Sequence, residues 1–229
     1  MKKILFSALC SFMIFSASGQ NTIDLFSRTN VDLHRNNRLE SKYEKAVGTP
    51  YTNDKFSLAS INNVASPVLV RYNAEADEIE VENKESEKKY FTLPKDKEYN
   101  QIAFKNGTYK FVLVNYKDVK GAEVNGYLIE KFAKNDVILF KKEKVNYVKG
   151  KEAENSYTMS SPAKLVRAKD EFYIQLKNKE IVEFPKNKKK FIAMFESKKD
   201  AINTYLKEND ISFSEESDMA KVTEFISTL

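Results

Sequence analysis

Apolar and polar residues alternate with a period of two over most of the chain from Lys55 to Phe184, and this pattern constrains the fold more than any other feature. Short polar segments interrupt the alternation, among them AEAD at 74–77, KDVKG at 117–121 and AKND at 133–136. Strands of this kind bury one face and connect through tight loops. We therefore predict an antiparallel β-meander of about eight to ten short strands, arranged as a curved sheet, a half-barrel or a sandwich.

The strongest local signal in this region is Asn106-Gly107, which lies between two alternating runs. Both residues accept positive φ, as the turn of a two-residue β-hairpin requires. Such a turn places Ile102 opposite Phe111 and Phe104 opposite Tyr109. Four apolar side chains then share one face of the hairpin, so the turn and the hydrophobic pattern agree.

After Pro185 the apolar period changes to about 3.6, which is typical of amphipathic helices. We predict three short helices that pack on the sheet or on one another, and the fold class is therefore α+β. Their apolar stripes are Phe191, Ile192 and Phe195, then Ala201, Ile202, Tyr205 and Leu206, and finally Met219, Val222, Phe225, Ile226 and Leu229.

The N-terminus has the layout of a secretory signal peptide. Lys2 and Lys3 precede an apolar run at 4–15, which is followed by small residues at 16–19. The run is too short to cross a bilayer as a helix, and we expect cleavage before Gln20. The chain then divides into a signal peptide at 1–19, a polar N-terminal arm at 20–50, an antiparallel β body at 51–184 and a C-terminal helical cap at 185–229 that packs on the body.

Export places the protein in the periplasm or outside the cell. The single cysteine, Cys10, lies within the predicted signal peptide, so we expect a disulfide-free protein that is stabilised by packing. No other run approaches the roughly 18 apolar residues that a membrane-spanning helix needs. We therefore expect a protein that is not integral to the membrane once the signal peptide is removed.

The stretch VRYNAEADEIEVE at 70–82 supplies the candidate binding residues, which are Arg71, Tyr72, Glu78, Glu80 and Glu82. The three glutamates are two residues apart and therefore project from the same face of one strand. Calcium takes six to eight oxygens from a curved loop, whereas a strand spreads such carboxylates about 7 Å apart. We expect a solvated face on which Arg71 pairs with one glutamate across the strands, with a metal or sugar site as the alternative.

Residues for familiar enzyme chemistry are scarce. His34 is the only histidine, it lies in the polar arm, and the chain without its signal peptide has no cysteine. Triad-type nucleophilic catalysis needs a positioned imidazole, and zinc sites draw on several His or Cys ligands. Glycine-rich phosphate loops are also absent from the sequence. We therefore assign no catalytic, cofactor-binding or metal-binding residue and expect no cofactor.

Nucleic acid is not an expected partner either. The charge of +5 for the whole chain falls to +3 without Lys2 and Lys3, and only two arginines, Arg71 and Arg167, follow residue 38. Two lysine clusters predict a solvated surface or a helix start, and they leave contact with anionic lipopolysaccharide as an alternative. The clusters are Lys141, Lys142 and Lys144, and Lys186, Lys188, Lys189 and Lys190.

Several segments resemble a group of secreted, uncharacterised proteins of Bacteroidota. They are GTPYTNDKF at 48–56, VRYNAEADEIEV at 70–81, GYLIEKF at 126–132, VILFKK at 137–142, and the C-terminal region from EFYIQL at 171–176 onward. The resemblance covers residues 48–229 and implies export. It implies no activity and transfers no functional residue.

These features favour an exported, non-enzymatic envelope protein that acts as a binding or interaction module for an envelope protein, a glycan or a lipid. The alternative is a carrier that holds an apolar, lipid-like ligand in its curved sheet beneath the helices. A carboxylate-only glycosidase is a weaker alternative, since that chemistry needs two acids and no histidine.

Overall fold

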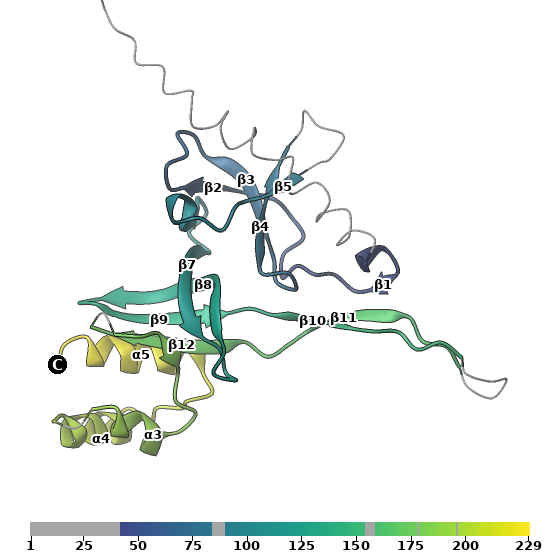
Figure 1. The fold of residues 1–229 in the computed structure, drawn as a ribbon. Coiled ribbons are helices and arrows are strands. Elements are labelled where there is room, and N and C mark those ends of the chain that lie inside the picture. Colours follow the sequence, from purple (N-terminus) through teal and green to yellow (C-terminus); the bar gives the residue numbers. More distant parts are fainter. Residues whose placement is uncertain (1–41, 84–89, 154–158, 178, 196) are drawn as a thin grey trace, which may run out of the picture.

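The computed structural model describes residues 42–83, 90–153, 159–177, 179–195 and 197–229. The predicted signal peptide, His34 and most of the predicted N-terminal arm lie outside these residues. Within them the chain forms a ten-stranded sheet, a three-stranded sheet and helices at the C-terminal end (Figure 1).

The ten-stranded sheet is antiparallel throughout and runs in the order β13-β12-β9-β8-β7-β6-β2-β3-β4-β5. It curls, so that β2 to β5 stand at a steep angle to β8, β9 and β12 (Figure 1). The prediction of a curved antiparallel sheet is confirmed. The order departs from a simple meander, because β6 pairs with β2 and β12 pairs with β9. The strands are β2 (Ser57–Ile61), β3 (Val68–Asn73), β4 (Glu78–Glu82), β5 (Tyr90–Thr92), β6 (Gln101–Phe104), β7 (Lys110–Lys117), β8 (Glu123–Lys134), β9 (Val137–Lys142), β12 (Glu171–Leu176) and β13 (Val182–Glu183).

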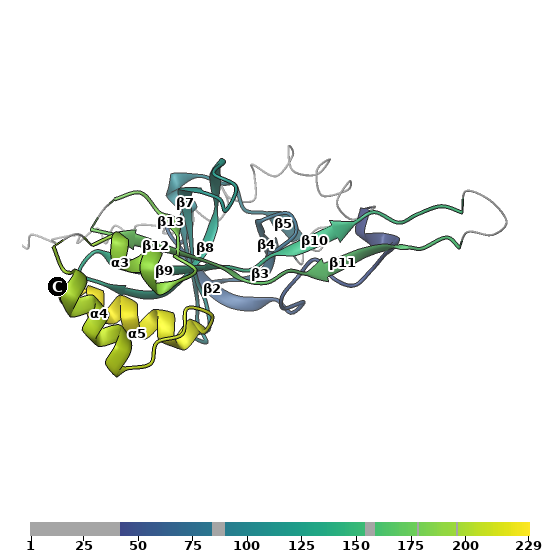
Figure 2. The same ribbon diagram turned by 90° about the horizontal axis from the view of Figure 1, so that it is seen from below.

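The three-stranded sheet consists of β1 (Ala46–Val47), β11 (Ala163–Arg167) and β10 (Val145–Val148), in the order β1-β11-β10. The pair β10 and β11 is antiparallel, and β1 adds to β11 in parallel. Both views show β10 and β11 running out from the body as a long ribbon (Figures 1 and 2).

The helices are α3 (Lys188–Ala193), α4 (Lys199–Glu208) and α5 (Glu216–Ile226), and a short 3₁₀ helix, η2 (Lys97–Tyr99), precedes β6. Helix α5 packs on β8 and β9. Buried residues of β9, β12 and the three helices form one continuous core, with Leu139, Ile174, Phe191, Leu206 and Val222 fully buried. A second core fills the curl of β2 to β8, and a third lies between β7, β8, β9 and β12.

The hairpin at Asn106-Gly107 follows the predicted register, because Ile102 pairs with Phe111 and the N–H of Phe104 donates to the carbonyl of Tyr109 at 2.9 Å. All four apolar side chains belong to one core. The turn itself differs from the prediction, since among the described residues of this turn only Gly107 has positive φ (72°). The N–H of Gly107 donates to the carbonyl of Phe104, so the loop has four residues rather than two.

Candidate functional site

The expected solvated face of β4 is buried, and this part of the prediction is wrong. Glu78 and Glu80 are each only 2% exposed, and Glu82 is half-buried. Alternation places these side chains on one face, as predicted, but another part of the chain covers that face. Tyr51 forms a β-bridge to Asn73 and brings the segment that follows Pro50 across the strands.

The predicted cross-strand pair is present within this buried face. Arg71 lies directly opposite Glu80, and its Nε donates to Glu80 Oε2 at 2.6 Å. The Glu80 carboxylate also accepts from the Tyr51 hydroxyl at 3.1 Å and from Asn73 Nδ2 at 3.3 Å. Buried charges persist when they are paired and fully hydrogen-bonded, so this cluster is an internal ion pair rather than surface decoration.

Aromatic rings enclose the arginine of this pair. The guanidinium carbon of Arg71 lies 3.9 Å from the ring centroid of Tyr51, 4.5 Å from that of Phe56 and 5.1 Å from that of Tyr90. Burial raises the pKa of the Glu80 carboxyl above its usual 4.5, although the charge and hydrogen bond of Arg71 oppose that shift. The rings and the carboxylate occupy the guanidinium, so the arrangement stabilises the β3–β4 hairpin.

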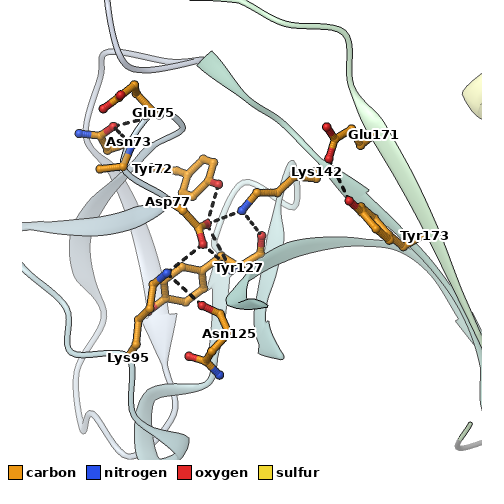
Figure 3. Close-up of polar contacts among 11 residues, drawn as sticks. Tyr72, Asn73, Glu75, Asp77, Lys95, Asn125, Tyr127, Lys142, Glu171 and Tyr173 are labelled. Atoms are coloured by element: carbon orange, nitrogen blue, oxygen red, sulfur yellow. Dashed lines mark hydrogen bonds and ion pairs between the residues drawn. The ribbon is translucent and has the colours of Figure 1, made fainter. Parts of the chain in front are cut away.

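A second polar cluster centres on Asp77, at the end of the turn between β3 and β4 (Figure 3). Its carboxylate accepts from the Tyr72 hydroxyl at 2.9 Å, from Lys95 Nζ at 2.9 Å and from the N–H of Tyr127 at 3.2 Å. Lys142 Nζ also donates to it and, at 2.9 Å, to the carbonyl of Tyr127. We call these five residues the Asp77 cluster. It joins the β3–β4 turn to β8 and β9, in the other part of the curled sheet.

Local backbone geometry aims the Asp77 carboxylate at this cluster. The Asn73 side chain accepts from the N–H groups of Glu75 and Ala76, which builds the turn, and Asp77 follows in the left-handed region at φ 57°. Gly126 in β8 leaves room for it, since a Cβ there would lie 2.5 Å from Asp77 Oδ2. A glycine within a strand is the sequence signal that could have pointed to this close approach.

Two ammonium groups, those of Lys95 and Lys142, face the single Asp77 carboxylate. Burial lowers the pKa of the Lys142 ammonium below its usual 10.5, and the Asp77 carboxylate opposes that shift. Burial, followed by the charge of Asp77, raises the pKa of the Tyr72 hydroxyl well above 10.0. The Asp77 carboxylate therefore meets three cationic or neutral donors and a backbone N–H, as expected of a structural cross-link.

Three of the five predicted candidates belong to these two clusters. Arg71 and Glu80 belong to the internal ion pair, and Tyr72 belongs to the Asp77 cluster on the opposite face of β3. Glu78 lies opposite Asn73, and Glu82 lies opposite Tyr90. In the part of the chain that the structure describes, no group of three or more His, Cys, Asp or Glu side chains is arranged to hold a metal ion.

The lysine clusters have different fates. The cluster at 186–190 is exposed and precedes or begins α3 behind the N-cap of Asn187, as predicted. The cluster at 141–144 is not a solvated face, because Lys142 is buried and Lys141 bonds Asp170 at 2.9 Å and Glu216 at 3.2 Å. Burial lowers the pKa of the Lys141 ammonium, but the hydrogen bonds to Asp170 and Glu216 outweigh this effect and raise the pKa above its usual 10.5.

An exposed apolar face on the three-stranded sheet was not foreseen from the sequence. Val47 is 59% exposed, Val148 50% and Val166 47%. Val47 and Val148 both lie opposite Lys164 in the register, and Val166 lies two residues further along β11, so all four side chains project from the same side. We call Val47, Val148, Val166 and Lys164 the valine face.

The other side of the same small sheet is packed against the body. Val145 and Leu165 are buried in the core of the curled sheet, and Ala46 and Tyr147 pack against it. The three-stranded sheet therefore packs one face on the body. The valine side chains of its other face stay about half exposed.

Two open cavities flank the helices. One, of about 590 Å³, lies between β12, β13 and the start of α5, and its wall mixes Phe172, Phe184 and Phe213 with charged side chains. The other, of about 620 Å³, lies beside α3 and the end of α5. Val137 at the start of β9 lines the second cavity, whereas Phe111 of β7 and Leu139 of β9 are buried among other side chains.

Comparison of the chain with protein-family models, with curated proteins and with solved structures finds no significant match. None of the helices in the described residues combines the length and the hydropathy needed to cross a bilayer.

Proposed function

We propose that this protein is an exported, non-enzymatic binding module of the cell envelope, related to the secreted Bacteroidota proteins that it resembles, and that the valine face is its docking surface. The observation that carries the proposal is the exposure of Val47, Val148 and Val166 on one side of a ribbon that runs out from the body (Figure 2). Contiguous exposed apolar surface on a soluble domain typically marks an interaction site.

The polar clusters support a structural body rather than a reactive centre. The carboxylates of Asp77 and Glu80 each accept at least three hydrogen bonds from side chains or backbone within the described chain. A general base or nucleophile needs a free lone pair directed toward a substrate, whereas these lone pairs are engaged internally.

A carrier for an apolar ligand is the second candidate, and the cavities beside the helices are its motivation. The wall of the first carries charged groups such as Glu183 and Lys186, and that of the second carries Lys177, Lys179 and Lys198. Apolar ligands bind in enclosed, mainly apolar pockets, and the apolar interior of the curled sheet is filled by side chains. These observations favour the binding module over the carrier.

The test is binding of the purified chain to isolated envelopes of the producing cells. We expect it to sediment with the envelopes, and we expect Val148→Asp to reduce this binding by at least about tenfold because a carboxylate replaces an apolar contact. Val119→Asp is the matched control, since Val119 is 39% exposed and lies on the β7–β8 turn, outside the valine face. Equal binding by both variants and the wild type would contradict the proposal.

The non-enzymatic part of the proposal has its own test. We expect no turnover of glycoside, ester or peptide substrates by the purified chain. Turnover that a single substitution such as Glu80→Gln abolishes, with the fold retained, would show an enzyme instead.

A further inference from the structure

We propose that the valine face docks on an anionic phospholipid surface. This inference rests on the proposed function and names the partner that the same surface binds. It follows from the arrangement of the apolar side chains, the charge of the ribbon that carries them and the shape of that ribbon.

The apolar part of the valine face suits shallow insertion. Val47, Lys164 and Val148 form one row across the three strands, and Val166 stands in the next row beside Asn146. Each valine is about half exposed, and Met159, further out on the ribbon, is 94% exposed. Exposed apolar side chains on a surface element can insert at the interface without a membrane-spanning element.

The charge of the ribbon favours an anionic surface. Residues 144–169 hold six basic side chains and two acidic ones, Glu152 and Glu154. Two of the basic side chains are paired, Lys144 with Glu171 and Arg167 with Glu143 and Asp170. Lys149, Lys164 and Lys169 are exposed. A lysine beside the valines can lay its methylene stem along the apolar surface and extend its ammonium to a phosphate. Basic residues close to apolar ones are typical of segments that recognise anionic lipid.

Composition favours lipid over a protein or a nucleic acid. Protein interfaces concentrate Trp, Tyr and Arg at their centres and are depleted in Lys, whereas this face consists of valines around a lysine. Nucleic acid would use the lysines but would gain nothing from exposed valines or Met159. A bilayer interface uses both kinds of side chain.

The shape of the ribbon allows the contact. The strands β10 and β11 run away from the curled sheet and from the helices in both views (Figures 1 and 2). The inner side is anchored by Val145 and Leu165, which are 4% and 7% exposed. Docking therefore requires no rearrangement of the body.

The test is flotation of the full chain with vesicles of phosphatidylcholine alone and of phosphatidylcholine mixed with phosphatidylglycerol. We expect binding to the mixed vesicles only, and weaker binding at high salt because the lysine contribution is screened. Lys164→Gln should weaken binding about fivefold. Val148→Asp should weaken it at least about tenfold.

Matched controls isolate the face. Lys207→Gln on α4 and Val119→Asp should leave binding unchanged, and circular dichroism should show the same fold for every variant. Equal binding to both vesicle types, or equal losses for face and control variants, would overturn the inference.

The two assays together separate the two proposals. If the protein fails to bind the vesicles while Val148→Asp still abolishes envelope binding, the lipid partner is wrong and the proposed function stands. If both assays fail, both proposals are wrong.

Discussion

Asp77 and Lys142, 65 positions apart in the chain, form a buried ion pair that ties the β3–β4 turn to the end of β9 (Figure 3). Lys142 is 8% and Asp77 20% exposed at the side chain. Breaking such a pair leaves a buried charge without its partner, and this relationship gives the first prediction.

Asp77→Asn should lower the free energy of unfolding by about 3 kcal/mol, because the buried Lys142 ammonium loses its counter-charge. Asparagine also accepts the left-handed backbone at this position, so the effect reports the charge. Asp136→Asn is a matched control, since Asp136 is exposed and has φ 60°. That variant should change stability by less than about 0.5 kcal/mol in urea denaturation. Equal losses of unfolding free energy for the two variants would contradict the structural role of the Asp77 cluster.

Gly126→Ala should also destabilise the protein, by about 2 kcal/mol, because its Cβ would displace the Asp77 carboxylate. The loss should shrink in an Asp77→Ala background, where the clash is absent. Gly107→Ala provides the contrast, since Gly107 has open space around it and φ 72°, so its cost of about 1 kcal/mol is backbone strain alone. Additive effects of Gly126→Ala and Asp77→Ala would contradict the contact.

Glu80 should make stability depend on pH in a defined direction. Its folded-state pKa lies above 4.5, so the folded protein holds this proton more tightly than the unfolded chain does. The resulting stabilisation is complete below about pH 4.5 and is lost as the pH rises through the folded-state pKa. We therefore compare the unfolding free energies of the wild type and Glu80→Gln. The difference in favour of the wild type should grow as the pH falls toward about 4.5.

Asp218 supplies a control of opposite sign for this pH experiment. Hydrogen bonds from Lys221 and from the N–H of Ser212 lower the pKa of the Asp218 carboxyl below its usual 3.8. Its stabilisation is therefore present above about pH 3.8 and lost as the pH falls through the folded-state pKa. Urea denaturation of Asp218→Asn across the same pH range should show the opposite slope, and a shared slope for both variants would contradict the assignment.

Local patterns predicted what neighbouring residues determine. The register at Ile102 and Phe111 follows from the turn and the alternation, and the pairing of Arg71 with Glu80 follows from the short loop between their strands. The exposure of the lysines at 186–190 follows from a helix start behind Asn187.

Features assembled from distant segments could not be read from the same patterns. Alternation shows that Glu78 and Glu80 share a face. Their burial depends on a segment distant in sequence, which includes Tyr51 and crosses that face. A solvated face and a covered one have the same period, and the charges that usually mark the surface are here neutralised by partners.

The valine face has the same origin. Val47 comes from the segment that precedes the curled sheet, whereas Val148 and Val166 come from the ribbon about a hundred residues later. No single segment carries an apolar run that would mark it. The parallel addition of β1 to β11 brings these residues together.

The most direct test of the valine face uses the absence of tryptophan from the chain, which makes any introduced indole a unique reporter. Val148→Trp places it on the face, and Val119→Trp places it on the β7–β8 turn, outside the face, where the native residue is 39% exposed. On addition of vesicles containing phosphatidylglycerol, we expect a blue shift and increased intensity of the fluorescence for Val148→Trp and an unchanged spectrum for Val119→Trp. Unchanged spectra for both variants, or the same shift for both, would contradict this expectation.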